Sequence, residues 1–320
     1  MLDVFFTVDV EVWCGGWQNL DQNFPAAYRR YIHGPTPSGE FGIPFQLKLL
    51  NEHKLKGVFF TEPLFSARFG KAPLQDLVGL IEGAGQETQL HLHTEWVDEA
   101  RAPLLPGVSV KRQHMRHFSR VEQAELIRLG RAMLREAGAP DINAFRAGNF
   151  GFNRDTLLAL ADNAMAFDSS YNASIMGLDS GVMPGTTLTE PMLCDGVHEY
   201  PMTVFNDGMQ ALRHAQLTAC SWGELEGLLW QALEQGRKQF VILSHGVELL
   251  NVAKDRPDPV VVKRMRDMCA FLDQHRDSFR TCGFRALAPV SVASQPPPLV
   301  SPFYRTGLRM MQQAGRRLYG

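Results

Sequence analysis

The stretch FFTVDVEVW at residues 5–13 has the pattern of a hydrophobic strand that ends on two acids. Successive side chains of a strand point to opposite faces, so Asp9 and Glu11 share one face while the valines around them take the other. Two carboxylates held together at the mouth of a folded domain repel each other, and such a pair typically binds a cation or handles a proton. This strand end is therefore the predicted centre of a site.

Outward from this strand, apolar stretches alternate with stretches of helical spacing. The spacing predicts further strands over 57–61, 88–96, 144–148, 165–170, 197–203 and 240–246. It predicts helices over 45–50, 73–84, 119–137, 153–164, 221–235 and 260–275. Residues 14–42 read as a long loop over the site, and residues 172–196 as irregular. Repeated strand–helix units with short apolar strands predict an α/β fold in which helices cover a parallel sheet.

The polar residues decide between an open sheet and a closed barrel, both of which fit this pattern. Asp9 with Glu11, His91 with His93, Arg146 and His245 all fall at the carboxyl ends of different predicted strands. Barrel enzymes keep their chemistry at that end of the strands. The sequence therefore favours a single (β/α) barrel domain over residues 1–294.

The composition argues against several classes of protein, among them general nucleic-acid binders and disulfide-rich proteins. A net charge of −2 over 320 residues gives no global field for nucleic acid or for a membrane. The five cysteines are scattered and odd in number, which argues against a disulfide framework or a structural zinc knot. With neither a signal-peptide pattern nor a long apolar run, we expect a cytoplasmic protein without a transmembrane segment.

Residues 295–320 form a separate segment, a proline-rich linker followed by a basic tail. Ser301 to Gly320 carries four arginines and no acid. The tail is expected to be a solvated or packed helix, with weak contact to a membrane surface or a partner as the alternative. The alternative rests on apolar residues that could form a stripe, namely Phe303, Tyr304, Leu308, Met311 and Leu318.

His91 and His93 share one face of a predicted strand, so both imidazoles can point at one ion. One packed histidine with an accidental neighbour would give the same pattern. With an acid pair on another strand end, two imidazoles and one carboxylate predict a metal site that keeps a position open for water. Glu95, four residues after His91, is a competing ligand, or else a surface acid.

Arg146 and His245 complete the set of candidate residues. The fixed charge of Arg146 can hold a carboxylate by paired hydrogen bonds, or form a structural ion pair instead. His245 ends a strongly apolar strand, and an imidazole with a pKa near 6.5 suits a general acid around neutral pH. A histidine that caps the following loop is the alternative.

These motifs together resemble the polysaccharide deacetylases with a NodB-type domain, a group of carbohydrate esterases. The resemblance covers about residues 2–290, and the order and spacing of the motifs carry it. The matching stretches are TVDVEVW (7–13), GVFFT (57–61), ETQLHLHTEW (87–96), FRAGNFG (145–151) and ILSHG (242–246).

The resemblance implies a distorted barrel of about seven strands that binds a divalent metal, zinc before cobalt or nickel. It implies that Asp9 is the catalytic base, that Arg146 orients this base and that His245 is the general acid. The family's second aspartate falls on Val10, so either Glu11 or Asp9 itself would be the carboxylate ligand. Its second histidine falls on Glu95, so His93 is the expected substitute beside His91.

The expected activity is removal of the N-acetyl group from an amino sugar in a cell-surface polysaccharide or its precursor. Similar variants occur among enzymes of lipopolysaccharide and exopolysaccharide assembly. One alternative is a hydrolase, metal-dependent or metal-independent, of another C–N amide bond, such as that of a small cyclic amide. The other is a non-catalytic glycan-binding or assembly protein with a degenerate site, which the departures at Val10 and Glu95 would explain.

Overall fold

The computed structural model describes residues 1–319, with side chains through residue 316. The side chains of Arg317 and Leu318, part of the predicted tail, lie outside the described residues. The chain divides into two compact units. The first contains residues 1–57, 203–282 and the segment from Pro298 onward, and the second contains residues 58–202 and 283–297.

The first unit is organised around β1 (Leu2–Val10), which pairs in parallel with β12 (Gln239–His245) and β13 (Phe279–Thr281). Nearly every residue of β1 is buried on both faces, as expected for a parallel strand covered by helices. Three of the helices in this unit are α2 (Ile43–Glu52), α7 (Trp222–Glu234) and α8 (Pro259–Gln274).

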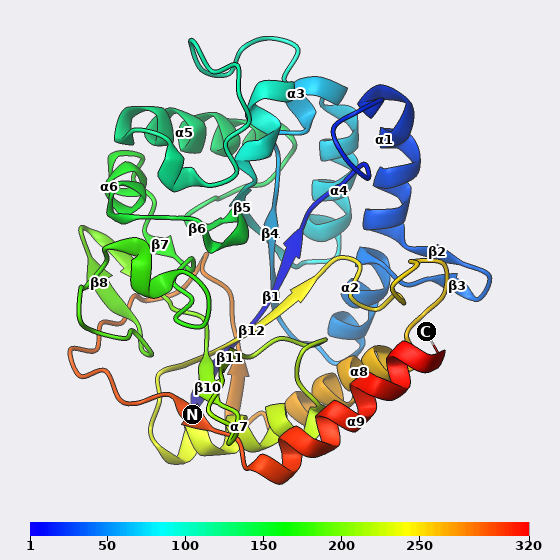
Figure 1. The fold of residues 1–320 in the computed structure, drawn as a ribbon, viewed down its shortest axis with the longest axis vertical. Helices are drawn as coiled ribbons and strands as arrows, with labels where there is room; N and C mark the ends of the chain where they lie inside the picture. The colour runs from blue at the N-terminus through cyan, green and yellow to red at the C-terminus, as the bar shows by residue number, and fades with distance from the viewer. Residues whose placement is uncertain (320) are drawn as a thin grey trace. The chain divides into compact units, whose positions relative to one another are not determined.

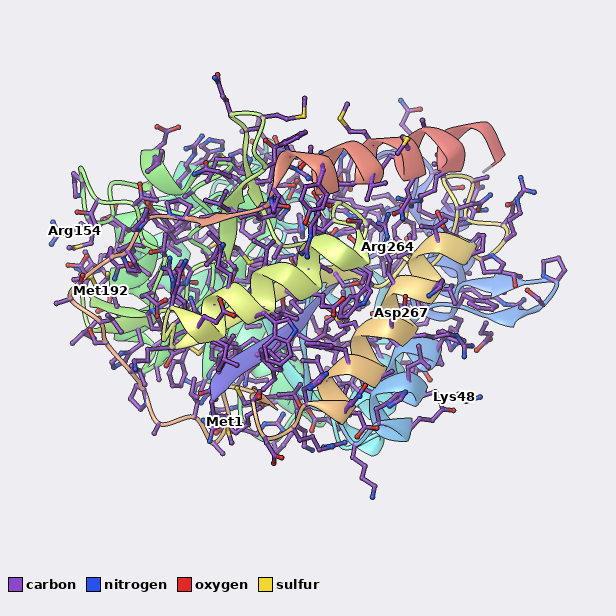
Figure 2. All side chains as sticks on the ribbon, turned by 90° about the horizontal axis from the view of Figure 1, so that it is seen from below. Met1, Lys48, Arg154, Met192, Arg264 and Asp267 are labelled. Carbon is purple, nitrogen blue, oxygen red and sulfur yellow. The ribbon has the colours of Figure 1, made fainter. Side chains whose placement is uncertain are left out.

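A small sheet and a terminal helix complete the first unit. The sheet has the order β11 (Leu212–His214), β10 (Val204–Asn206), β14 (Leu299–Val300). Helix α9 (Phe303–Tyr319) follows β14 and lies beside α7 and α8 (Figures 1 and 2). None of the helices within residues 1–319 is long and apolar enough to cross a membrane.

The second unit holds the strand order β4-β5-β6-β7-β9-β8, in which every pair is parallel except β8 with β9. These strands are β4 (Gly57–Thr61), β5 (Glu87–Leu92), β6 (Ala144–Ala147), β7 (Phe167–Asp168), β8 (Met192–Cys194) and β9 (Val197–Glu199). The helices between them are α3 (Ser66–Phe69), α4 (Ala72–Gly83), α5 (Arg120–Glu136) and α6 (Arg154–Asp162). Helices α5 and α6 lie side by side (Figure 1).

The predicted fold class is confirmed, because the strands are mostly parallel and alternate with helices. Helix α5 begins where the sequence predicts, since Ser119 and Glu122 form the expected capping box. The remaining predicted helices, and the strands that carry candidate residues, are found within a few residues of their expected bounds.

Three local predictions are wrong. The predicted loop 14–42 contains helix α1 (Leu20–Tyr28), a π-helical turn (Arg29–His33) and the hairpin β2–β3 (Pro35–Thr36 and Gly39–Glu40). Strand β5 ends at Leu92, and a 3-10 helix begins at Thr94. The stretch predicted as irregular includes β8, whose antiparallel pairing with β9 needs only a two-residue turn.

Candidate active site

Asp9 and Glu11 lie at the carboxyl end of β1, where the sequence predicts them. Asp9 is buried, and Glu11 is one residue beyond the strand and half-buried. The indole N–H of Trp13 donates to Oε2 of Glu11 at 2.7 Å. Asp9, Glu11 and His245 each offer one ligand atom, and these atoms lie within 4.8 Å of one another. The first unit thus gathers two acids and one imidazole, three groups suited to moving protons or binding a cation.

His245 reaches this cluster because β1 and β12 are parallel neighbours with Asp9 opposite His245. Nδ1 of His245 lies 2.8 Å from Oε1 of Glu248. Burial lowers the pKa of His245, but the hydrogen bond to Glu248 and the negative charges of Glu248, Asp9 and Glu11 outweigh it and raise the pKa to about 9. The imidazole is therefore protonated at neutral pH and carries a proton that it can donate.

Glu248 belongs to this cluster through its contact with His245, and the sequence pattern did not single it out. Its side chain is almost fully buried, and it also accepts hydrogen bonds from Gln216 and, at 3.4 Å, from the hydroxyl of Ser244. Gln46 of α2 donates to the carbonyl oxygens of His245 and Gly246 at 3.1 and 3.3 Å. These bonds fix both the side chain and the backbone of His245.

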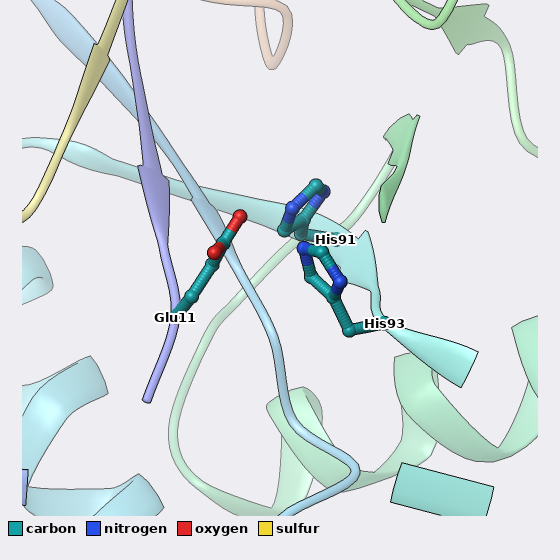
Figure 3. Close-up of side chains that lie close together, drawn as sticks. All are labelled: Glu11, His91 and His93. Carbon is teal, nitrogen blue, oxygen red and sulfur yellow. The ribbon is translucent and has the colours of Figure 1, made fainter. Parts of the chain in front are cut away.

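His91 lies on β5 in the second unit, with its ring buried. Nδ1 is 2.8 Å from the carbonyl oxygen of Arg146 on the neighbouring strand β6. A carbonyl oxygen only accepts, so Nδ1 carries the proton and Nε2 is the nitrogen that can bind a cation. The rings of His91 and His93 stand edge to face, with centroids 4.8 Å apart (Figure 3). The structure thus brings the predicted imidazole pair together.

His93 follows β5 directly and is as buried as His91. Its Nδ1 lies 3.3 Å from Oε2 of Glu95, whose other oxygen accepts from Nδ2 of Asn149 at 3.3 Å. Glu95, a competing ligand in the sequence, is thus a hydrogen-bond partner of the imidazole. A carboxylate in this position orients the ring and raises its basicity toward a cation.

Gly148, in the FRAG stretch, leaves room for the ring of His93. A Cβ atom at this position would lie 2.7 Å from the carbonyl oxygen of Leu92 and 2.8 Å from Nδ1 of His93. Real Cβ atoms essentially never come this close, so a larger residue would displace the imidazole. The glycine is therefore part of the site, although it offers no ligand.

Arg146 is completely buried on β6. Its Nε donates to the carbonyl oxygen of Ser169 at 3.0 Å, and one terminal nitrogen lies 3.0 Å from the Ser169 hydroxyl. The guanidinium carbon lies 4.3 Å from the centroid of the Phe60 ring, a cation–π distance. These contacts hold the guanidinium plane in one orientation.

Next to Ser169, a second acid pair lies in the interior of the second unit. Asp168 of β7 and Glu199 of β9 are register partners, and both are fully buried. Burial raises the pKa of Asp168, and burial together with the charge of Asp168 raises the pKa of Glu199 well above its usual value. In this pair the neutral form of each carboxyl group is favoured over the charged form, because both lie in the packed interior of the second unit.

No protein-family model matches the chain, and no curated protein matches it in sequence. Among solved structures, a presumed polysaccharide deacetylase from Mycobacterium smegmatis superimposes with a TM-score of 0.55 at 17% identity, over 92% of this chain and 94% of that one. The chain has the polysaccharide deacetylase fold. At this identity the likeness concerns the fold alone.

Other structures of this fold give lower scores. A family 4 carbohydrate esterase from Streptomyces lividans, solved in complex with acetate, has a TM-score of 0.43 at 12% identity over 91% of this chain and 96% of that one. A family 4 pseudoenzyme from Bacillus anthracis has a TM-score of 0.44 at 13% identity over 87% of this chain and 63% of that one.

The polysaccharide deacetylase fold that the sequence motifs predicted is thus confirmed. Within it, the predicted residues fall at strand ends in both units: Asp9, Glu11 and His245 in the first, and His91, His93 and Arg146 in the second. At the two departures from the family pattern, Val10 is buried in β1 and Glu95 bonds to His93.

Proposed function

We propose that this protein is a metal-dependent deacetylase that hydrolyses the N-acetyl group of an amino sugar in a cell-surface polysaccharide or its precursor. The observation that carries the proposal is a pair of buried imidazoles in the second unit, from His91 and His93, whose ring centroids lie 4.8 Å apart (Figure 3). In this proposal the carboxylate ligand is Glu11 of the first unit. Products of the reaction would be free acetate and an amino sugar.

The donor set fits a divalent cation of the zinc type. Zinc takes imidazole nitrogens and carboxylate oxygens, and three protein ligands leave a fourth position for water or substrate. The bond from His91 to the Arg146 carbonyl and the bond between His93 and Glu95 both engage Nδ1, which leaves Nε2 of each ring for the ion. Cobalt and nickel accept the same donors. A bound cation would supply Lewis acidity toward the attacking water and the acetyl carbonyl.

The protein's own groups would move the protons. Asp9 would accept a proton from the water that attacks the acetyl carbon, and Arg146 would orient this carboxylate. As the C–N bond breaks, the charged imidazole of His245 would donate its proton to the departing amine. Glu248 supports this role because it keeps His245 protonated and fixes its ring at 2.8 Å.

Aromatic side chains of the first unit suit a sugar ring. Trp13 and Trp17 are half-buried and stand edge to face, with centroids 5.9 Å apart. Tyr31 lies near Glu11, and its pKa is raised by burial first and by the Glu11 charge second. Such rings offer apolar faces with a polar edge, a combination that suits the mixed surface of a glycan.

Metal content and acetate release from N-acetylglucosamine oligomers test the proposal together. The purified protein should contain about one equivalent of metal; chelation should abolish acetate release, and zinc, cobalt or nickel should restore it. His91→Ala and Glu11→Ala should lose metal, whereas Asp9→Asn should keep metal but lose at least ~100-fold in kcat, the scale of a lost general base.

A chelated, metal-free protein that works at full rate would overturn the mechanism. Metal binding without acetate release from these oligomers, but with hydrolysis of small cyclic amides, would overturn the substrate class.

A further inference from the structure

Tyr31 borders the carboxyl end of β12 in the first unit. It lies in the π-helical turn that follows α1, and its side chain is half-buried. Gly246, the residue after His245, packs so closely against this turn that a Cβ atom there would lie 3.1 Å from the carbonyl oxygen of Tyr31. The backbone N–H of Gly246 donates to the carbonyl oxygen of Asp9 at 3.2 Å. Tyr31 therefore stands beside the strand ends that carry Asp9 and His245.

A lysine covers the ring of Tyr31. Nζ of Lys254 lies 5.5 Å from the centroid of this ring, a cation–π distance. The side chain of Lys254 is half-buried. None of the ion pairs among the described side chains, those of residues 1–316, involves its ammonium group. The lysine therefore presents a positive charge that no carboxylate in this part of the chain neutralises.

The turn over residues 251–256 holds Lys254 in position. The backbone N–H of Lys254 donates to the carbonyl oxygen of Asn251 at 3.0 Å, and the N–H of Asn251 donates to the carbonyl oxygen of Arg256 at 3.0 Å. The buried side chain of Asn251 donates to Oδ1 of Asp255 at 2.9 Å and accepts from the N–H of Asp255 at 3.1 Å. Lys254 itself has a φ of 56°, a conformation that a residue other than glycine keeps only when its surroundings fix it. The lysine is therefore placed by a hydrogen-bonded turn.

Arg30 adds a second positive charge near the same ring. Burial first and the Glu11 charge second raise the pKa of Tyr31, whereas the charge of Arg30 acts in the opposite direction. Charges act on a hydroxyl over short distances, so the guanidinium of Arg30 lies close to Tyr31. Arg30 is exposed, and it too takes part in no ion pair among the side chains of residues 1–316. Two cations without acid partners thus flank one aromatic ring.

We propose that Lys254 and Arg30 bind a phosphate group carried by the amino-sugar substrate. A lysine ammonium binds phosphate as a point charge, and an arginine guanidinium binds it through paired hydrogen bonds. The ring of Tyr31, between these cations and the strand ends, offers an apolar surface to the sugar. The sugar in this inference rests on the proposed function, and the phosphate makes a precursor, not the finished polymer, the substrate. The phosphate site itself can be tested without the reaction.

The charge balance around Tyr31 favours a phosphate over other sugar substituents. A phosphate monoester carries about 1.5 to 2 negative charges at pH 7, which matches two cations better than the single charge of a uronic acid. A neutral glycan offers these cations only uncharged acceptors, and hydrogen bonds to uncharged groups are weaker. The nearby acids are already engaged. Asp255 accepts from Asn251 and lies 3.9 Å from Nε of Arg256, and Glu11 accepts from Trp13.

Titration calorimetry of the full chain with glucose 1-phosphate and with glucose tests the phosphate site. The wild type should bind the phosphorylated sugar at least ~10-fold more tightly, the scale of a charge-assisted contact. Lys254→Met, which can still pack on the ring of Tyr31, should reduce this preference at least ~5-fold, whereas Lys254→Arg keeps the charge and should retain it. Lys48→Met is the matched control, because Lys48 is 70% exposed on α2 and pairs with Glu52. An unchanged preference in Lys254→Met, or an equal loss in Lys48→Met, would overturn the proposal.

Acetate release separates the phosphate site from the proposed function. If both hold, kcat/KM should be at least ~10-fold higher for N-acetylglucosamine 1-phosphate than for N-acetylglucosamine, mainly through KM, and Lys254→Met should lower this ratio. Binding of glucose 1-phosphate that depends on Lys254, in a protein that releases no acetate from either sugar, would support the phosphate site and overturn the proposed function. Equal kcat/KM values for both sugars would overturn the phosphate site alone. Tighter binding of glucuronic acid than of glucose 1-phosphate would overturn it in favour of a carboxylate.

Discussion

Nδ1 of His245 lies 2.8 Å from a carboxylate oxygen of Glu248, three residues further along the chain. This pair counteracts burial, which alone would lower the pKa of the imidazole, and the pKa is raised to about 9 with the help of Asp9 and Glu11. The imidazole is thus charged across the neutral range, and Glu248 is the largest single contributor to that charged state.

Glu248→Gln should shift the alkaline limb of the pH–rate profile downward. The amide keeps a similar shape but loses the charge, so the pKa of His245 should fall from about 9 toward its ordinary value of 6.5. Around pH 8 kcat should fall at least tenfold, whereas metal content should not change. The profile of acetate release from pH 5 to 10 measures this, and an unshifted alkaline limb would remove Glu248 from the mechanism.

The same substitution should change stability with pH in a defined direction. The folded-state pKa of His245 lies above the unfolded-state value of about 6.5, so its protonation stabilises the fold fully below that pH. This stabilisation is lost as the pH rises through about 9. Wild type and Glu248→Gln should therefore differ most in free energy of unfolding near pH 6 and converge above pH 9, as urea titrations would measure.

Gly148→Ala should weaken metal binding without removing a ligand. The new Cβ would lie 2.8 Å from Nδ1 of His93, so the imidazole must move. Displacing a ligand or its orienting partner typically costs about 10- to 100-fold in metal affinity. Competition with a fluorescent zinc chelator would measure this loss. Gly79→Ala in α4 is the matched control, because nothing lies within 4 Å of its Cβ and alanine is the better helix former; an equal loss there would contradict the argument.

Glu199→Gln should flatten the dependence of stability on pH. In the folded state the pKa of Glu199 is raised well above 4.5, so the native protein holds a proton that the unfolded chain releases. Stability therefore falls as pH rises from the unfolded pKa toward the folded one, by up to about 1.4 kcal/mol per pH unit. Urea unfolding at pH 5, 6, 7 and 8 should show this slope in the wild type and in Glu136→Gln, an exposed control, but a reduced slope in Glu199→Gln.

Arg309→Ala should destabilise the first unit by ~2–4 kcal/mol, because it leaves the buried carboxylate of Glu224 without one of its cationic partners. Arg305→Ala, which loses only a bond to the backbone oxygen of Gly223, should cost less than ~1 kcal/mol. Thermal unfolding of both variants measures the difference. Equal effects would show that the inward charge of α9 does not hold the helix in place.

Much of the fold and of the candidate residue set could be predicted from the sequence. Short apolar strands that end in Asp, His or Arg mark the carboxyl edge of a parallel sheet. Strands β6 and β12 end within one residue of their predicted ends, whereas β5 ends four residues early, at Leu92. The tail was correctly predicted as a helix. Which of its faces meets the protein depends on acids of α7 and α8, far away in sequence, so periodicity alone could not decide it.

The missed features have physical reasons too. Helix α1 has buried residues at Leu20, Phe24 and Ala27, a helical spacing, but Pro25 and the surrounding glycines, asparagines and tryptophans hide it. In the sequence, Glu248 is an acid in the loop after β12. Its contact with His245 depends on the turn between them, which the sequence pattern does not reveal. Gly148 reads as an ordinary turn glycine, since its role depends on a ring that another strand supplies.

The pairing of β1 with β12 has a consequence for how the chain folds. The hydroxyl of Thr7 on β1 donates to the carbonyl oxygen of Ile242, 235 positions later. During synthesis the ribosome therefore releases the first strand long before the strand that pairs with it, and until then the backbone of a mostly apolar strand stays unpaired on that side. We expect refolding from urea to be slow and to need dilute protein or a chaperone, with the bond between Thr7 and Ile242 among the last to form.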